Sequence, residues 1–225
     1  MWKIAREVTA EIIFPKRCRI CRGYGSFICQ DCKELLDISS VHNPDRSRKY
    51  LKDIYSAGSY ENKYLEKIIH NFKYEPFCQG LGTDLAQLII DHFQLAQIDL
   101  SLRGPVIVPV PLADKRIRWR GFNQAQVIAE RLGTFLCIPV DTDVLKRTRE
   151  TKTQTGLDRP ARHKNINGAF NCKKTDSIKN KSVLIIDDVV TTGATMEECA
   201  RVLIENGASS VTGISIARAS NSGND

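Results

Sequence analysis

The stretch VLIIDDVVTTGAT, residues 183–195, decides more about the fold than any other part of the chain. Its four apolar residues, Val183 to Ile186, predict a buried strand. Two carboxylates follow, and then a turn rich in threonine and glycine at the start of a helical pattern. A strand that leads through such a turn into a helix is typical of a phosphate site, because backbone N–H groups and the helix dipole meet there.

The adjacent carboxylates of Asp187 and Asp188 need a partner other than phosphate. They can accept hydrogen bonds from a sugar diol or approach a magnesium ion. The stretch therefore predicts a site for a sugar phosphate. The competing interpretation is a buried strand that ends in a solvated turn, which gives no structural reason for two neighbouring acids.

Helical and strand patterns alternate through the rest of the chain. We expect helices over 60–74, 81–93, 123–133 and 195–206, and strands over 105–111 and 209–217. Asn123 is a candidate N-cap, and Gly133 and Gly207 are candidate helix stops. Such alternation predicts an α/β fold with a parallel sheet flanked by helices, and a ligand at the carboxyl ends of the strands.

Basic charge is concentrated in two segments that we expect to be loops. Residues 115–120 hold four Lys or Arg and no acid, and residues 146–164 hold seven against two acids. Arginine binds phosphate bidentately, so these segments are candidate anion sites; a solubility patch is the alternative. For pyrophosphate or another anion, the candidate ligands are Lys115, Arg116, Arg118 and Arg120.

The second basic segment, with the aromatic residues near the first, is a candidate nucleic-acid surface or a mobile lid. Phe122 has the alternative role of anchoring its segment on the core. The candidates for contact or closure are Trp119, Phe122, Lys146, Arg147, Lys152, Arg162 and Lys164.

Four of the eight cysteines fall within fifteen residues, in the pattern C-x2-C-x7-C-x2-C. Two such pairs can supply the four thiolates of a tetrahedral structural zinc site, and two disulfides are the alternative. The candidate zinc ligands are Cys18, Cys21, Cys29 and Cys32. We interpret the other cysteines as buried apolar residues.

Composition places the chain among ordinary globular proteins, since 42% of its 225 residues are hydrophobic and 26% are charged. No apolar run approaches the ~18 residues of a membrane span. Charges at Arg6, Glu7 and Glu11 argue against a signal peptide, so we expect a cytoplasmic protein whose N-terminus forms a short helix.

The stretch 183–195 resembles the phosphoribosyl pyrophosphate (PRPP) motif of the type I phosphoribosyltransferases. The resemblance implies that Asp187 and Asp188 hold the ribose hydroxyls, that Mg²⁺ accompanies PRPP, and that the turn holds the 5′-phosphate. The turn residues are Val190, Thr191, Thr192, Gly193, Ala194 and Thr195.

The cysteine module together with VPVPL (108–112), RGFNQA (120–125), QTGLDRPAR (154–162) and NGAF (167–170) resembles the ComF family. The resemblance implies a type I phosphoribosyltransferase-like sheet (51–218) behind an N-terminal helix and zinc finger (1–50), with a flexible tail (219–225). It also implies a role in natural transformation, on single-stranded DNA inside the cell, with a competence helicase or another DNA-processing protein as a candidate partner.

Two other functions fit the same motifs. One is an active phosphoribosyltransferase of nucleotide metabolism whose acceptor is unidentified. The other is a nucleic-acid-binding regulator that responds to PRPP. The sequence names no covalent catalytic residue, because pentosyl transfer depends on positioning and electrostatics.

Overall fold

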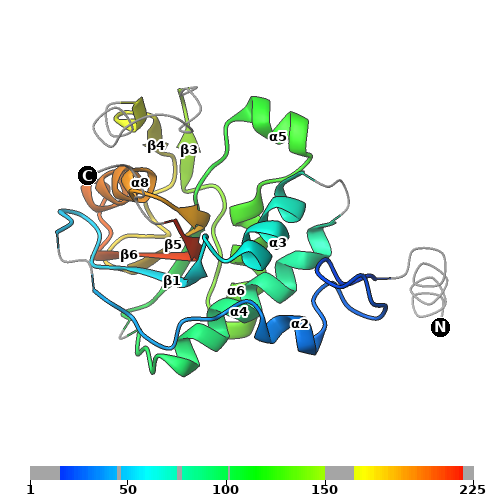
Figure 1. The fold of residues 1–225 in the computed structure, drawn as a ribbon. Coiled ribbons are helices and arrows are strands. Elements are labelled where there is room, and N and C mark those ends of the chain that lie inside the picture. Colours follow the sequence, from blue (N-terminus) through cyan, green and yellow to red (C-terminus); the bar gives the residue numbers. More distant parts are fainter. Residues whose placement is uncertain (1–15, 45–46, 75–77, 101, 150–164, 220–225) are drawn as a thin grey trace, which may run out of the picture.

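A computed structural model describes residues 16–44, 47–74, 78–100, 102–149 and 165–219 (Figure 1). A four-stranded sheet lies at the centre of this described part, in the order β1-β6-β5-β2, and every neighbouring pair is parallel. The parallel α/β architecture is therefore confirmed. Its strands are β1 (Ile54–Ser59), β2 (Val106–Pro109), β5 (Ser182–Val190) and β6 (Ser210–Arg218).

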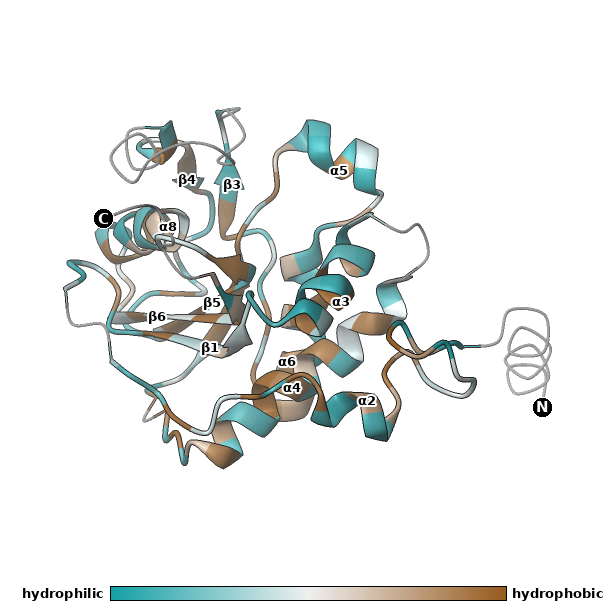
Figure 2. Cartoon of the chain, in the orientation of Figure 1, coloured by the Kyte–Doolittle hydropathy of each residue, from teal (hydrophilic) through white to brown (hydrophobic). Residues whose placement is uncertain are grey.

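Helices cover both faces of the sheet (Figure 1). One face carries α3 (Lys63–Tyr74), α4 (Leu81–Leu95) and α6 (Gln124–Leu136), and the other carries α8 (Ala194–Glu205). In β5, Leu184 and Ile186 pack in the first core, whereas Val183 and Ile185 pack in the second. This alternation follows from the two-residue period of a strand. The apolar colour accordingly gathers in the sheet and on the surfaces of α4 and α6 (Figure 2).

The topology places a ligand site between β2 and β5. These strands are paired from Val106↔Val183 to Pro109↔Ile186. The chain leaves β2 for α6 on one face and leaves β5 for α8 on the other. In open α/β sheets, ligands bind at the carboxyl ends of neighbouring strands whose helices diverge in this way.

The segment 115–120 is helical, which corrects the expectation of a loop. It belongs to α5 (Asp114–Arg120), which ends at Gly121 with a φ of +79°. No residue of α5 is buried, and its hydrophilic colour is plain in Figure 2. A helix without an apolar face lacks the periodicity by which sequence analysis recognises helices.

Two glycines were expected to end helices, and only one of them does. Gly207 does follow α8, with a φ of +100°. Asn123 also caps α6 as predicted, its side chain accepting a hydrogen bond from Ala125 N. Gly133, however, does not end α6, which continues to Leu136. A Cβ at Gly133 would lie 2.4 Å from Val140 Cγ2, so close packing is what this glycine permits.

The second basic segment is partly described. Its first residues belong to β3 (Leu145–Arg147), which pairs with the antiparallel strand β4 (Phe170–Cys172) that follows the segment, so part of the expected loop is a strand. Such three-residue strands carry too few positions for a pattern to reveal them. Residues 150–164 lie outside the described residues, and with them the candidates Lys152, Arg162 and Lys164. The expected N-terminal helix and most of the tail lie outside as well.

The cysteine module at residues 16–44 packs on the body of the protein. It contains one short helix, α2 (Gln30–Glu34), and its residues Ile28 and Leu36 belong to the same core as Leu65 of α3. None of the helices in the described ranges has the length and apolar composition needed to cross a bilayer.

Candidate functional site

Strand β5 carries both predicted carboxylates and divides them between the two faces of the sheet. Because β5 continues to Val190, Asp187 and Asp188 lie inside the strand and not in the turn after it. Asp188 has the alternation of the α3 face, and its Oδ1 lies 2.9 Å from Lys73 Nζ of α3. Asp187 has the alternation of the α8 face and interacts electrostatically with Arg147.

The two carboxyls therefore lie in different electrostatic environments. Burial raises the pKa of Asp187 to about 7, and the negative charge of Asp188 adds to this effect. Burial lowers the pKa of Lys73, but the Asp188 carboxylate outweighs it and leaves the pKa raised. The site thus holds an ion pair between Asp188 and Lys73 and, beside it, a carboxyl whose pKa lies near 7.

Residues 191–195 form a tight turn from β5 into α8. Gly193 has a φ of +76° and precedes the first residue of the helix. Thr191, Gly193 and Thr195 line a cavity, whereas Thr192 is buried beneath the turn and accepts a hydrogen bond from Ala194 N. The N-terminus of α8 therefore opens on the cavity, which is the geometry of a phosphate-binding turn.

The segment 47–50 braces this turn. Arg48 donates a hydrogen bond to the carbonyl oxygen of Thr192 at 3.1 Å, and a Cβ at Gly193 would lie within 2.8 Å of its guanidinium. Glu197, in the first turn of α8, accepts the backbone N–H groups of the two residues that follow Arg48, both at 2.9 Å. The linker between the cysteine module and β1 thus holds the turn in place.

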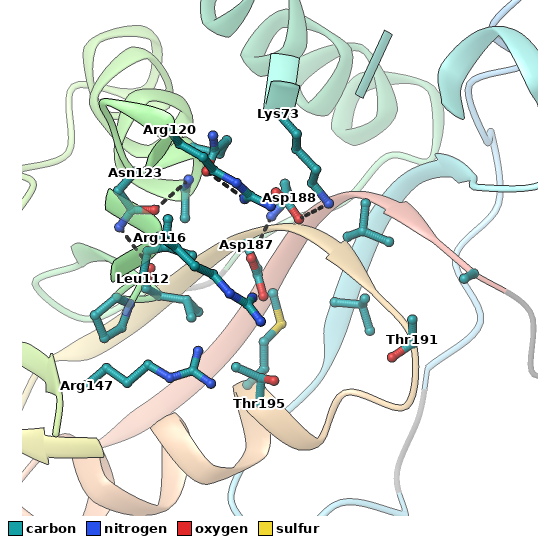
Figure 3. Close-up of a pocket in the computed structure, with 18 of the residues that line it drawn as sticks. Lys73, Leu112, Arg116, Arg120, Asn123, Arg147, Asp187, Asp188, Thr191 and Thr195 are labelled. Carbon is teal, nitrogen blue, oxygen red and sulfur yellow. Dashed lines mark hydrogen bonds and ion pairs between the residues drawn. The ribbon is translucent and has the colours of Figure 1, made fainter. Parts of the chain in front are cut away.

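A cavity of about 790 Å³ lies over the carboxylates and the turn (Figure 3). Arg116 and Arg120 of α5 line it, together with Arg147 of β3. Burial lowers the pKa of Arg147, and the positive charge of Arg116 contributes. Lys115 and Arg118 are exposed and do not line the cavity. Clustered guanidinium groups on one wall of a cavity favour an anionic ligand.

Two aromatic residues close to the cavity differ in their surroundings. Trp119 is 69% exposed, lines the cavity and meets Tyr74 edge to face, with ring centroids 5.7 Å apart. Phe122 instead packs on Phe72 of α3, with centroids 5.6 Å apart. Phe122 thus anchors α5 to the core, whereas Trp119 offers a ring face to a ligand.

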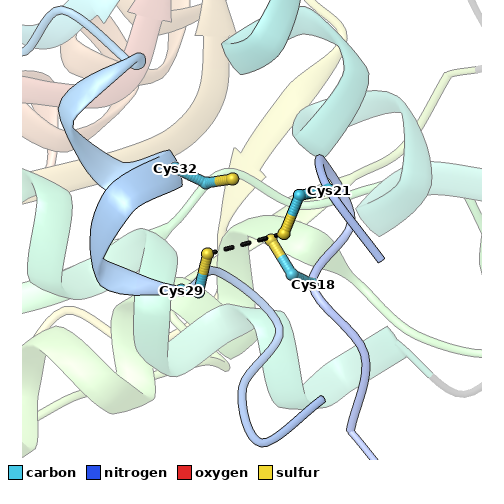
Figure 4. A group of neighbouring side chains, drawn as sticks. All are labelled: Cys18, Cys21, Cys29 and Cys32. Carbon is cyan, nitrogen blue, oxygen red and sulfur yellow. Dashed lines mark hydrogen bonds between the residues drawn. The ribbon is translucent and has the colours of Figure 1, made fainter. Parts of the chain in front are cut away.

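The four cysteines of the module come together (Figure 4). Their Sγ atoms all lie within 4.8 Å of one another, and those of Cys21 and Cys29 are 3.6 Å apart. Zn–S bonds of about 2.3 Å in a tetrahedron separate the sulfurs by about 3.8 Å. All four cysteines are free thiols. The cluster is therefore compatible with zinc, and the structure does not show the alternative of two disulfides.

The remaining described cysteines differ from expectation in part. Cys199 is fully buried in α8, as predicted, and Cys172 is half-buried. Cys137 is exposed, because it ends α6 in a left-handed conformation with a φ of +54°. An exposed helix end has no core for the thiol to fill.

Comparison with known proteins identifies the family of this chain. The model of the "Phosphoribosyl transferase domain" family matches residues 108–223, which is slightly more than half of the chain. The chain is 35% identical to competence protein F of Haemophilus influenzae over 157 residues, 69% of this chain and 68% of that protein. The chain belongs to the ComF family of phosphoribosyltransferase-domain proteins.

Other relatives of this ComF protein have related names. DNA utilization protein YhgH of Escherichia coli is 34% identical over 148 residues, 65% of this chain and 64% of that protein, so the match spans less than two thirds of the relative. Competence protein ComFC of Bacillus subtilis is 34% identical over 115 residues, half of this chain and 44% of that protein. Among solved structures, the allosteric regulatory enzyme of purine biosynthesis is 22% identical to this chain, with a TM-score of 0.35. The match covers 60% of this chain and 24% of that enzyme's chain.

Proposed function

We propose that this ComF protein binds PRPP with Mg²⁺ in the cavity and acts in the handling of internalised single-stranded DNA. The observation that carries the proposal is that three kinds of surface surround one cavity: the carboxylates Asp187 and Asp188, the turn at 191–195, and the arginines of α5 and β3. They suit, respectively, a ribose diol, a 5′-phosphate and a pyrophosphate. The names of the relatives, which refer to competence and DNA utilization, support the second part of the proposal.

The carboxylate oxygens of Asp187 and Asp188 are hard donors that fit a magnesium ion beside the ribose. When bound, the ion supplies charge neutralisation at the pyrophosphate. The chain itself orients the sugar through the two carboxylates and holds the 5′-phosphate at the N-terminus of α8. Its arginines stabilise the negative charge that develops on the leaving pyrophosphate, and a nucleophile attacks the opposite face of the ribose.

Calorimetric titration of PRPP with Mg²⁺ into the zinc-loaded protein tests the pocket. We expect binding that Asp187→Asn with Asp188→Asn abolishes while the circular dichroism spectrum is unchanged. Asp141→Asn with Asp143→Asn, two half-buried to exposed carboxylates outside the cavity lining, is the matched control and should bind normally. Equal PRPP affinity in the Asp187/Asp188 double variant would show that the site has been assigned wrongly.

The DNA part of the proposal rests on the outer side of α5. Lys115 and Arg118 are exposed there, next to the exposed ring of Trp119 at the cavity. Cations beside an exposed aromatic ring suit a single strand, where stacking contributes roughly 1–3 kcal/mol per base. DNA bound on α5 would lie beside PRPP, so the two ligands should influence each other.

Fluorescence anisotropy with labelled oligothymidine tests this surface. Trp119→Ala should weaken DNA binding about tenfold, while Phe135→Ala, which removes an exposed aromatic ring near the C-terminal end of α6, should not. DNA affinity that changes on adding PRPP would favour a PRPP-responsive regulator. Product formed from PRPP and a defined acceptor would favour an active phosphoribosyltransferase. Full DNA affinity in Trp119→Ala would remove α5 from the proposal.

The N-terminal module completes the proposal. We assign one structural Zn²⁺ to the four thiolates of the cysteine module, and residues 51–218 to the phosphoribosyltransferase domain. A competence helicase or another DNA-processing protein is the candidate partner. Co-purification of the helicase with the intact protein, and its loss in Cys18→Ser with Cys21→Ser, would test the module as the docking element.

A further inference from the structure

Helix α3 is tied at its N-terminal end to the cysteine module. Asn62, the residue before the helix, accepts hydrogen bonds through Oδ1 from Tyr64 N at 3.0 Å and from Leu65 N at 3.1 Å, so it is the N-cap of α3. Its Nδ2 donates to the carbonyl oxygen of Leu35, in the module, at 2.9 Å. One side chain thus begins the helix and joins it to the module.

Further contacts hold the module against α3 and the start of α4. Lys67 Nζ of α3 lies 3.5 Å from the carbonyl oxygen of Ile20. A Cβ at Gly80, the residue before α4, would lie 2.3 Å from Phe27 Cε2, so a ring of the module occupies the space beside this glycine. Such close packing leaves little room for the module and the body to shift independently.

The C-terminal end of α3 forms part of the cavity. Lys73, in its last turn, reaches Asp188 at 2.9 Å, as Figure 3 shows. The ring of Tyr74 meets that of Trp119 edge to face, and the Cζ atom of Arg120 lies 5.3 Å from the centroid of Tyr74. The last turn of α3 therefore positions one carboxylate of the proposed ribose site and the cationic end of α5.

The body of α3 connects these two ends as one rigid element. Its apolar face is fully buried and consists of Leu65, Ile68, Ile69 and Phe72. Close-packed interiors transmit strain, because side chains that interdigitate cannot move singly. A displacement of the helix at Asn62 therefore reaches Lys73 and Tyr74 at the cavity.

We infer that the cysteine module is a positioning element of the cavity: its docking on the body holds, through α3, the Asp188 carboxylate and α5 in the arrangement that binds the ligand. The inference rests on the proposed function for the identity of that ligand. The module and the cavity are then coupled sites, and coupling between affinities is reciprocal. Loosening the module weakens PRPP binding, and bound PRPP strengthens zinc binding by the same factor.

Asn62→Asp tests this contact in the full-length zinc-loaded protein. Aspartate is as good an N-cap as asparagine, but it replaces the amide donor with a carboxylate oxygen that repels the Leu35 carbonyl. PRPP affinity, measured by calorimetry with Mg²⁺, should fall about fivefold or more. Asn206→Asp is the matched control, since Asn206 Nδ2 donates to the carbonyl oxygen of Val202 at 2.8 Å, outside the cavity lining. It should bind PRPP as the wild type does.

Trp119 reports the same coupling without PRPP. Trp2 and Trp119 are the two tryptophans of the chain, so Trp2→Phe leaves a single tryptophan, next to Tyr74. Removal of zinc by a chelator, or Asn62→Asp in the loaded protein, should increase the quenching of Trp119 by iodide, whereas Asn206→Asp should not. In the wild type, saturating PRPP should raise the affinity for zinc, measured against a competing chelator, by the factor by which zinc raises the affinity for PRPP.

Wild-type PRPP affinity in Asn62→Asp, or an affinity for zinc that PRPP leaves unchanged, would overturn the inference. A wild type that binds no PRPP would instead overturn the proposed function. In that case the iodide measurement still decides the inference: increased quenching of Trp119 in Asn62→Asp would support coupling of the module to the cavity wall, and unchanged quenching would overturn it.

Discussion

Asp187→Asn should stabilise the folded protein at neutral and alkaline pH, although it removes a carboxylate of the proposed ribose site. Burial, with the charge of Asp188 as the second cause, raises the pKa of Asp187 from 3.8 to about 7. Because the folded-state pKa is the higher one, the contribution of this carboxyl to stability is complete below pH 3.8 and is lost as pH rises through 7.

The size of the effect follows from these two pKa values. At about 1.4 kcal/mol for each pH unit between them, ionising Asp187 costs roughly 4 kcal/mol of unfolding free energy above pH 7. Asparagine can still accept the hydrogen bond that Asp188 N donates to this side chain at 2.9 Å. It loses the attraction to Lys73 and Arg147, so we expect a net gain of about 1–3 kcal/mol at pH 8, which raises the melting temperature by several degrees.

Urea unfolding followed by circular dichroism at pH 5.5 and pH 8 measures the effect. The advantage of Asp187→Asn over the wild type should be about 2 kcal/mol larger at pH 8. Asp188→Asn is the control, because it also removes the like-charge repulsion but leaves Lys73, whose side chain is 17% exposed, without its ion-pair partner. It should be less stable than Asp187→Asn. Equal advantages at both pH values, or no gain at pH 8, would refute the reasoning.

Three further predictions concern the ligand, the metal and the turn. PRPP affinity should rise up to tenfold between pH 6 and pH 8, as the ionised fraction of Asp187 rises from about a tenth to nine tenths; calorimetry should find this step absent from Asp187→Asn. The purified protein should hold one zinc ion per chain by emission spectrometry, and a chelator or Cys32→Ser should lower the melting temperature by several degrees, since Ile28 and Leu36 pack in the core beside the cysteine cluster. An unchanged melting temperature without zinc would contradict this. Gly193→Ala should cost about 1–3 kcal/mol and weaken PRPP binding at least tenfold, because of its positive φ and the nearby Arg48 guanidinium; combined with Arg48→Met it should cost less than the sum of the two single changes.

The features that could be predicted from the sequence have all their determinants close together in the chain. The stretch 183–195 contains its strand, turn and helix start, and the cysteine pattern spans fifteen residues. Both could be recognised without knowing the fold. Lys73 and Arg48 could not, because Lys73 reaches Asp188 and Arg48 reaches Thr192 only when distant segments pack together.

The basic segment 115–120 lies between these cases. Its four cations were predicted as one group, yet only Arg116 and Arg120 line the cavity. Residues four apart lie on the same face of a helix, and Lys115 and Arg118 fall on other faces. The selection follows directly once the segment is known to be helical. The sequence therefore lacked only the information that this segment is a helix, because a charged and fully exposed helix has no apolar periodicity.

The two carboxylates show how much a strand boundary can decide. If Asp187 and Asp188 lay in a turn, both side chains could face the same ligand and would have similar surroundings. Inside β5 they alternate as Leu184 and Ile185 do, so each is surrounded by a different core. Asp188 gains a cation from α3, whereas Asp187 gains burial and stays partly protonated. A diol that bound both groups would therefore meet one carboxylate already paired with Lys73 and one carboxyl that is partly protonated, so its affinity should depend on pH through Asp187.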